Sequence, residues 1–407
     1  MADLFGFISI ALVSFITYLV ARLYPEISKI LFTALILRIL FMLIGHYIIP
    51  LPDSTADARS FENAAWEIGQ NGFFNLLDYY PGPDSRFISW LIAIPYSLFG
   101  RSELMAESIS LFLGMGCVFL GWKLANVLWD NNAAIKAGWA IALFPSLVLY
   151  SVLVMREVYV CFFILVALHG IVNWVKTDNF KLIILAIMGF IGATFFHGAM
   201  MIGLITFLTI IGIIIFKRSF KLLINYRINL KFFICLLLLL FVTELYLSNK
   251  INVQYLGTFE STSSANNLQQ KINSSTRGVA SYPEWAKVNS LIEMPYKIPA
   301  RAIYFIFSPF PWDVKEPKHL IGMIDGFLYM YLVFLVICNI KVIWKDPALK
   351  IILIILLSYI LIFAVGVGNF GTGIRHRSKF VIILLILVAP LIHKLVFRKK
   401  IYRLLKN

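Results

Sequence analysis

The stretch YSVLVMREVYVCFFILV (Tyr150–Val166) places a charged pair, Arg156 and Glu157, between two strongly apolar runs. Over the whole chain of 407 residues, 60% of the residues are hydrophobic and 14% are charged. A soluble protein of this length cannot bury that much apolar surface, so the composition indicates an integral membrane protein. In that setting the charged pair predicts the tip of a tight hairpin between two membrane spans, facing water or the lipid headgroups.

Apolar runs long enough to cross a bilayer recur along the chain. A hydrocarbon core of about 30 Å needs about 20 apolar residues in a helix, which satisfies its own backbone hydrogen bonds. We therefore expect an all-α fold, a polytopic transmembrane helical bundle with about eleven spans. The predicted spans are 4–22, 30–50, 107–128, 137–155, 158–174, 181–196, 199–216, 232–248, 320–343, 349–367 and 380–396.

The predicted spans and loops divide the chain into five segments. Two N-terminal spans are followed by an outer loop with short helices near the membrane, a central bundle, a large outer loop and a C-terminal bundle with a basic tail. These segments are 1–50, 51–106, 107–248, 249–319 and 320–407.

Two basic segments, 217–231 and 393–407, predict the orientation because Lys and Arg collect in cytoplasmic loops. The same tendency accounts for the net charge of +15 without a nucleic-acid partner. An odd number of spans then places the hairpin tip and the loops 51–106, 249–319 and 368–379 on the outer side. The short apolar run 87–100 contains Pro95, and we interpret it as a helix lying at the outer interface.

The first outer loop carries the candidate acidic residues. Asp53 and Asp57 follow a predicted span directly, and Asp57 opens a predicted helix over 57–69. One of these two carboxylates can cap that helix while the other has a chemical role. Candidate acceptor-binding residues are Arg86 and Tyr80 in this loop, and His197 at another outer tip.

The last outer loop, GNFGTGIRHRSKF (368–380), combines glycines with Arg375, His376, Arg377 and Lys379. Positive charge on the outer face runs against the usual distribution, which indicates anion binding. Arginine matches phosphate oxygens with two parallel donors, and glycine lets backbone N–H groups approach. In an extended loop Arg375 and Arg377 would point the same way, with His376 opposite. Arg156 is a further candidate for the phosphate.

An acid for proton abstraction beside a phosphate-binding cluster is the layout needed to act on a lipid-linked phosphosugar. The stretches DARSFENAAWEIG (57–69), FISWLIAIPYSLFGRSELMAESISLFLG (87–114) and AGWAIALFPSLVLYSVLVMRE (137–157) also resemble a known family. They are similar to the GT-C superfamily of polyprenyl-phosphate-dependent glycosyltransferases, which includes protein O-mannosyltransferases and lipid A aminoarabinose transferases. The resemblance implies a GT-C-like fold, with Asp57 as the catalytic carboxylate and Glu157 at the family's second acidic position.

The chain departs from that pattern at both acidic positions. Ala58 stands where many members have Glu, and Glu157 replaces the usual Asp. The Arg-His-Arg loop resembles those of O-antigen polymerases and ligases, whose donor is a polyprenyl diphosphate. Monophosphate and diphosphate donors, and single transfer and polymerisation, therefore stay open.

The sequence predicts glycosyl transfer at the outer face of a bacterial cytoplasmic membrane. Asp57 or Asp53 would take the proton of the acceptor hydroxyl, and the basic residues would hold the leaving phosphate. The expected partners are a polyprenyl-linked sugar donor, a glycan or lipid acceptor and membrane lipids. The sequence identifies no cofactor, and a divalent metal is compatible with the outer carboxylates although no ligand spacing demands it.

The alternatives are a repeat-unit polymerase of the same broad fold and a flippase for lipid-linked oligosaccharides. A transporter keeps ionisable residues deep in its spans. The deep candidates here are Arg38, Glu244 and Asp325, and we expect Arg38 to extend to the inner face and the other two to lie near outer ends. That distribution favours an enzyme.

Overall fold

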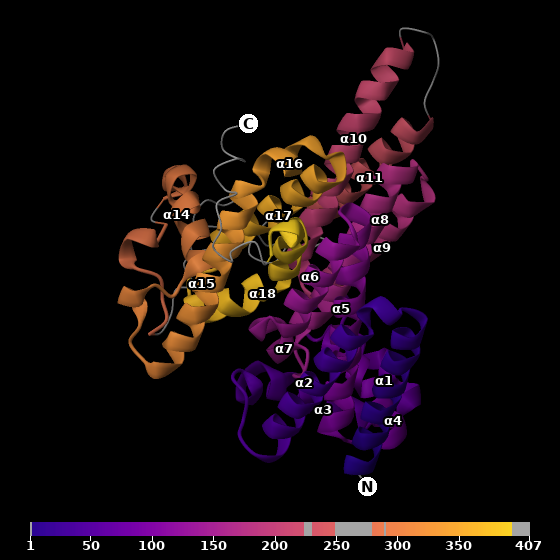
Figure 1. Ribbon diagram of the computed structural model, residues 1–407, viewed down its shortest axis with the longest axis vertical. Coiled ribbons are helices and arrows are strands. Elements are labelled where there is room, and N and C mark those ends of the chain that lie inside the picture. The colour runs from indigo at the N-terminus through magenta and orange to yellow at the C-terminus, as the bar shows by residue number, and fades with distance from the viewer. Residues whose placement is uncertain (1, 224–229, 249–278, 289, 393–407) are drawn as a thin grey trace.

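A computed structural model describes residues 2–223, 230–248, 279–288 and 290–392 (Figure 1). Within these ranges the chain is helical and forms no β-strand, apart from one isolated bridge between Ser281 and Asn369. The helices near the N-terminus, α1 to α4, lie at one end of the molecule, and α14 to α18 lie together on one side (Figure 1). The basic tail 393–407 and parts of the segments 217–231 and 249–319 lie outside the described residues.

Seven helices in the described ranges are long and apolar enough to cross a membrane. They match seven of the predicted spans, which confirms a polytopic helical membrane protein. These spans are formed by α1 (Ala2–Leu23), α2 (Ser28–Tyr47), α5 (Glu103–Leu128), α8 (Arg156–Thr177), α10 (Met201–Leu223), α15 (Pro317–Cys338) and α17 (Pro347–Gly366).

The other four predicted spans overlap helices that are not among these seven. The segment 137–155 contains two short helices, α6 (Asn131–Leu143) and α7 (Pro145–Tyr150), followed by non-helical residues. The others are α9 (Lys181–Phe196), α11 (Leu230–Leu247) and α18 (Phe370–Leu387). The count of eleven crossings therefore stays a prediction.

The first outer loop folds into short helices, as predicted. Asp57 lies in a single turn, η2 (Ser54–Ala58), just ahead of α3 (Arg59–Gly69). After η3 (Phe73–Tyr79), the apolar run forms α4 (Phe87–Phe99), which packs against α3.

A buried carboxylate, Glu62, locks this pair of helices together. Its Oε1 accepts a hydrogen bond from the Tyr96 hydroxyl at 2.7 Å, and its Oε2 accepts one from Arg101 Nη2 at 2.5 Å. Burial and the neighbouring Glu62 raise the pKa of Tyr96, so its hydroxyl stays a hydrogen-bond donor. The turn that carries Asp57 leads directly into α3, and α3 is held against α4 by these hydrogen bonds.

The predicted hairpin tip at 156–157 is wrong. Helix α6 ends at Leu143, Pro145 opens the short α7, and the chain then runs without helical structure to Met155. Helix α8 begins at Arg156, which is 6% exposed, and Glu157 is 1% exposed. The physical reason is that interior cations neutralise Glu157, so the charge does not have to reach water.

The prediction of a Gly-rich loop at 368–380 is also wrong, because most of these residues belong to the helix α18 (Phe370–Leu387). The side chain of Asn369 accepts hydrogen bonds from the backbone N–H groups of Gly371 at 2.8 Å and Thr372 at 3.3 Å. This N-cap starts α18, which packs against α8 and α15. A helix turns by about 100° per residue, so Arg375 and Arg377 lie on nearly opposite faces instead of pointing the same way.

Candidate active site

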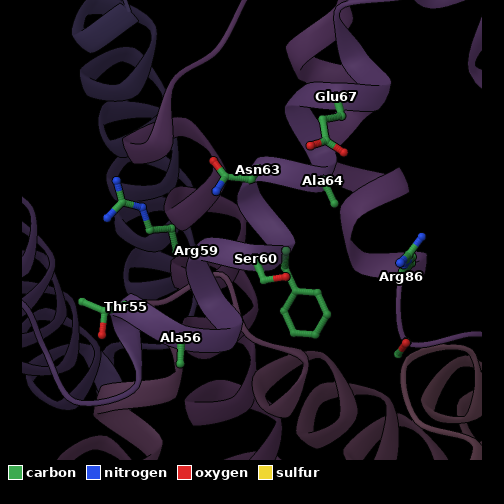
Figure 2. Close-up of a pocket in the computed structure, with 10 residues that line it drawn as sticks. Thr55, Ala56, Arg59, Ser60, Asn63, Ala64, Glu67 and Arg86 are labelled. Carbon is green, nitrogen blue, oxygen red and sulfur yellow. The ribbon is translucent and has the colours of Figure 1, made fainter.

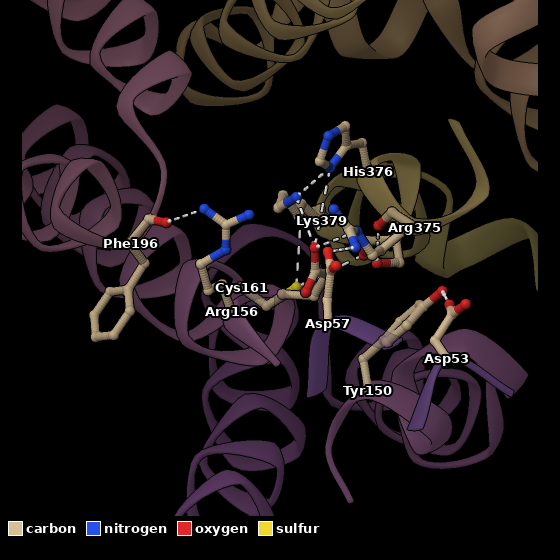
Figure 3. A network of polar contacts seen from close by, with 11 residues as sticks. Asp53, Asp57, Tyr150, Arg156, Cys161, Phe196, Arg375, His376 and Lys379 are labelled. Carbon is tan, nitrogen blue, oxygen red and sulfur yellow. Dashed lines mark hydrogen bonds and ion pairs between the residues drawn. The ribbon is translucent and has the colours of Figure 1, made fainter. Parts of the chain in front are cut away.

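Charged side chains from three distant parts of the chain meet in one cluster (Figure 3). The turn before α3 supplies Asp57, the first turn of α8 supplies Glu157, and the first turns of α18 supply Arg375, His376 and Lys379. The packing of α18 against α8 brings these segments together. We name this group the acid–base cluster.

Arg375 links the two carboxylates of the acid–base cluster. Its Nη1 donates to Oδ2 of Asp57, and its Nε lies 3.5 Å from Oε1 of Glu157. The Asp57 side chain is 45% exposed, whereas that of Glu157 is 2% exposed. The Asp57 carboxylate is thus half exposed, whereas the Glu157 carboxylate is part of the interior that holds Arg375.

Lys379 is a fully buried cation, with 0% of its side chain exposed. Its Nζ donates to Oε1 of Glu157 at 3.0 Å and lies 2.7 Å from Nδ1 of His376. Burial of an ammonium group is tolerable only with such a charged partner. The His376 ring in turn packs edge-on against His197, with centroids 5.1 Å apart. His197 is therefore an inner neighbour of the cluster, and it is 1% exposed.

Arg156, the neighbour of Glu157 in sequence, borders the cluster at the start of α8. Its Nη1 donates to the carbonyl oxygen of Phe196 at 3.4 Å, and its guanidinium lies 5.1 Å from the centre of the Phe61 ring. A cation over an aromatic face is favourable. Arg156 therefore ties α8 to α3 and to the end of α9.

The two acidic candidates of the first loop differ in their surroundings. Asp53 has a left-handed backbone conformation, with φ of 64°, and its Oδ2 accepts a hydrogen bond from the Tyr150 hydroxyl at 2.8 Å. Asp57 faces a cation instead, and the Arg375 contact uses only Oδ2. This geometry favours Asp57 as the chemical group and Asp53 as an anchor between the loop and α7.

Arg377, a predicted phosphate ligand, is not part of the acid–base cluster. It is 1% exposed, and its Nε and Nη2 donate to Oδ2 of Asp325 at 3.0 and 2.7 Å. Its remaining bonds go to carbonyl oxygens of Gly322, Ile306 and Ser308. All faces of the guanidinium fork are occupied, so Arg377 fastens α18 to α15 and to α14 (Met294–Phe307).

A cavity of about 660 Å³ opens beside the turn that carries Asp57. Its polar lining includes Arg59, Ser60, Asn63, Glu67, Ser85 and Arg86. Figure 2 shows Arg59 and Arg86 on opposite sides of this cavity. We name it the outer cavity.

The outer cavity includes one of the two candidate acceptor-binding residues of the first loop. Arg86 lines it, and Tyr80 does not. The Tyr80 ring instead packs edge-on against Trp90 and Phe87, at 5.1 and 6.3 Å between centroids.

Arg38, predicted to extend to the inner face, is buried instead and is 1% exposed. Its Nε donates to the Ser151 hydroxyl and its Nη1 to the carbonyl oxygen of Ala142, both at 2.9 Å. It therefore supplies donors to the broken segment between α6 and α8, where backbone groups lack helical partners. The sequence signal for the broken segment was present in Pro145, since a proline within an apolar span indicates an interrupted helix.

In the part of the chain that the structure describes, no group of three or more His, Cys, Asp or Glu side chains is placed to hold a metal ion. The acidic groups of the cluster are paired with Arg375 and Lys379. Side chains of these types, a carboxylate beside cations, are the kind that supply general-base catalysis and electrostatic stabilisation of an anion.

Comparisons with protein-family models, with curated proteins and with solved structures find no match for this chain.

Proposed function

We propose that the protein is an integral membrane glycosyltransferase. It moves a sugar or oligosaccharide from a polyprenyl phosphate or diphosphate carrier to an acceptor, at the outer face of a bacterial cytoplasmic membrane. The observation that carries the proposal is Asp57, a half-exposed carboxylate that is held by Arg375 at the edge of a large polar cavity. An exposed base beside buried cations suits the attack of a hydroxyl group on a phosphate-linked sugar.

In this reaction Asp57 takes the proton of the acceptor hydroxyl group. The acceptor oxygen forms a bond to the anomeric carbon of the sugar, and the bond from that carbon to the carrier phosphate breaks. The bonding electrons leave with the phosphate oxygen. General-base assistance of this kind is worth about 10²–10⁴-fold in rate.

The remaining residues of the acid–base cluster hold Asp57 in place. Glu157 fixes Arg375 and Lys379 through one oxygen, Oε1. Its other oxygen, Oε2, is buried and accepts no hydrogen bond from the described residues. Arg375 then presents its Nη1 to Asp57 and orients the carboxylate.

A flippase for lipid-linked oligosaccharides is the second candidate. The observation in its favour is the Lys379–Glu157 pair, which lies buried between α8 and α18, where a transporter would keep its ionisable groups. The half-exposed Asp57 and the outer cavity favour the enzyme, because a carrier that only crosses the membrane needs no exposed base.

The test separates the two functions in one preparation. The purified protein is reconstituted in vesicles with a radiolabelled polyprenyl-linked sugar and candidate acceptors, and products are identified by mass spectrometry. Glycosylated acceptor with release of the carrier phosphate supports the transferase, and product length separates single transfer from polymerisation. Movement of intact lipid-linked sugar across the bilayer, without any product, would replace the proposal with the flippase.

A further inference from the structure

A second cavity, of about 240 Å³, also borders the η2 turn that carries Asp57. Its ionisable side chains are mostly acidic. They are His46, Arg59, Glu62, Glu103 and Glu107. We name it the acidic cavity.

Two of the three glutamates in the acidic cavity have a local reason for their charge. Glu62 accepts hydrogen bonds from Tyr96 and Arg101. Glu103 is the first residue of α5, where the positive end of the helix favours a carboxylate, and its side chain is 53% exposed. Nδ1 of His46 lies 3.9 Å from Oε2 of Glu103, which is too long for a hydrogen bond.

Glu107 has no such reason for its charge. Its Oε2 is buried and accepts no hydrogen bond from the described residues, and its carboxylate forms no ion pair with them. Glu103 lies one helical turn earlier on the same face of α5, and like charges at this spacing repel. The helix is long enough to cross a membrane, where a carboxylate without a cation is costly. The acidic cavity, which Glu107 lines, is the place from which a cation can reach it.

The lining of the acidic cavity determines which kind of cation fits. Among the described residues, no group of three or more His, Cys, Asp or Glu side chains is placed to hold a metal ion. Arg59 lines the cavity but forms no ion pair with Glu103 or Glu107. An ammonium group carries three N–H donors, which suits two carboxylates one helical turn apart. Leu153 and Val154 provide an apolar wall for the carbon atoms attached to it.

We infer that the acidic cavity binds the ammonium group of a primary amine, with Glu107 as its main partner and Glu103 as the second. Helix α5 begins a membrane span at Glu103, so amine-bearing lipid headgroups lie at the level of the cavity, and a soluble amine presents the same group. The site goes beyond the proposed function and does not depend on it, because binding is measured without transfer.

Calorimetry on the full chain in phosphatidylcholine nanodiscs tests this inference, with glycerophosphoethanolamine, glycerophosphocholine and ethanolamine as probes. The wild type is expected to bind glycerophosphoethanolamine at least about 10-fold more tightly than glycerophosphocholine, whose quaternary nitrogen has no N–H donor. Glu107→Gln should weaken amine binding by about 10- to 100-fold, the range for one charged hydrogen-bonding partner. Glu103→Gln should weaken it by about 2- to 5-fold, because the Glu103 side chain is half-exposed.

Glu26→Gln is the matched control, since Glu26 lies exposed between α1 and α2 and should leave every affinity unchanged. The melting temperature without ligand gives a second readout. Glu107→Gln should melt at or above the wild-type temperature, because it removes a charge that no described cation neutralises. A fall of several degrees would show that the protein itself supplies a partner for this carboxylate, which overturns the inference.

The two amines separate the possible sources of the ligand. Tighter Glu107-dependent binding of glycerophosphoethanolamine than of ethanolamine shows recognition of a lipid headgroup, and equal or weaker binding shows recognition of a soluble amine. Both support the site. Equal affinity of the wild type for glycerophosphoethanolamine and glycerophosphocholine, no binding of either amine, or wild-type amine affinity in Glu107→Gln overturns it.

Discussion

Arg375 and Arg377 show how closely a residue's role depends on its place around a helix. Both lie in the N-terminal half of α18, two positions apart. Arg375 turns toward the carboxylates of Asp57 and Glu157, whereas Arg377 turns toward Asp325 and the end of α14. The contacts of Arg375 leave Asp57 half-exposed, whereas the Arg377–Asp325 ion pair is buried.

Arg377→Lys should lower stability more than it lowers activity per folded molecule. Lysine keeps the charge but cannot reach Asp325 and three carbonyl oxygens at once. Each buried acceptor left without its hydrogen bond costs about 1–3 kcal/mol. The apparent melting temperature in detergent measures the effect, with Arg22→Lys as the exposed control. An unchanged melting temperature together with lost activity would place Arg377 in the chemical site after all.

Glu157→Gln should be more damaging than Lys379→Met. Removal of the Glu157 charge leaves Lys379 buried without a carboxylate, whereas removal of the Lys379 charge leaves Glu157 paired with Arg375. An uncompensated buried charge costs about 3–5 kcal/mol. The double variant should therefore melt closer to the wild type than Glu157→Gln does, and strictly additive losses would argue against this coupling.

At the scale of single residues, the sequence showed which charges are unusual but not which are paired. Asp57, Glu157, Arg375 and Lys379 were all identified, because charges are rare in a chain of this composition. Their neighbours were not, because Glu157 and Lys379 are separated by 222 positions. Only the packing of α18 on α8 decides that these two side chains meet and that Arg377 faces away.

At the scale of elements, helix ends were harder to predict than helices. Glycines and charges in 368–380 indicated a loop, but the Asn369 cap starts a helix through them. The reverse happened at 137–155, where an apolar run of span length is broken at Pro145. Local propensity is a weak prior here, since tertiary contacts satisfy the charges and the free backbone groups.

Helices α8 and α9 are held together by small residues, and this contact can be tested separately. A Cβ atom added at Gly189 would lie 2.4 Å from the backbone nitrogen of Ala167, and one at Gly170 would lie 2.5 Å from that of Ala186. Close approach of this type is typical of membrane helix pairs. The close packing of α8 against α9, and with it the position of α8 and its Glu157, therefore depends on these glycines.

Gly189→Ala should separate α8 from α9 and lower the melting temperature by several degrees, because backbone atoms cannot move aside as a flexible side chain can. Gly212→Ala in α10 is the matched control, since no atom lies within 4 Å of its added Cβ. It should be neutral or slightly stabilising, as alanine favours a helix by about 1 kcal/mol. Equal effects of the two substitutions would contradict the packing described here.

At the scale of the molecule, composition was enough for the fold class and for most membrane spans. Seven predicted spans match helices of suitable length, because a continuous apolar run leaves few alternatives to a membrane helix. The arrangement of those helices was not predictable, since it depends on contacts between distant segments such as the turn at Asp57 and α18. The orientation rests on basic segments that lie partly outside the described residues.

The orientation can be tested with cysteines introduced one at a time into a background with Cys235 and Cys338 replaced by serine, since Cys117 and Cys161 are buried. Asn75→Cys, exposed in the first loop, should react with an impermeant maleimide added outside intact cells. Asn179→Cys, exposed between α8 and α9, should react only after the cells are opened. Positive loops kept in the cytoplasm give this pattern. Reversed labelling would move the acid–base cluster to the inner face.

The most direct measurement is single-turnover transfer by Asp57→Asn with the donor already bound. Asparagine keeps the size of Asp57 but cannot accept a proton, so transfer should fall by about 10²–10⁴-fold while donor affinity and melting temperature stay near those of the wild type. Asp53→Asn is the control, because the Asp53 carboxylate is engaged by Tyr150, and it should keep most of the rate. Near wild-type transfer by Asp57→Asn, with or without loss in Asp53→Asn, would contradict the account.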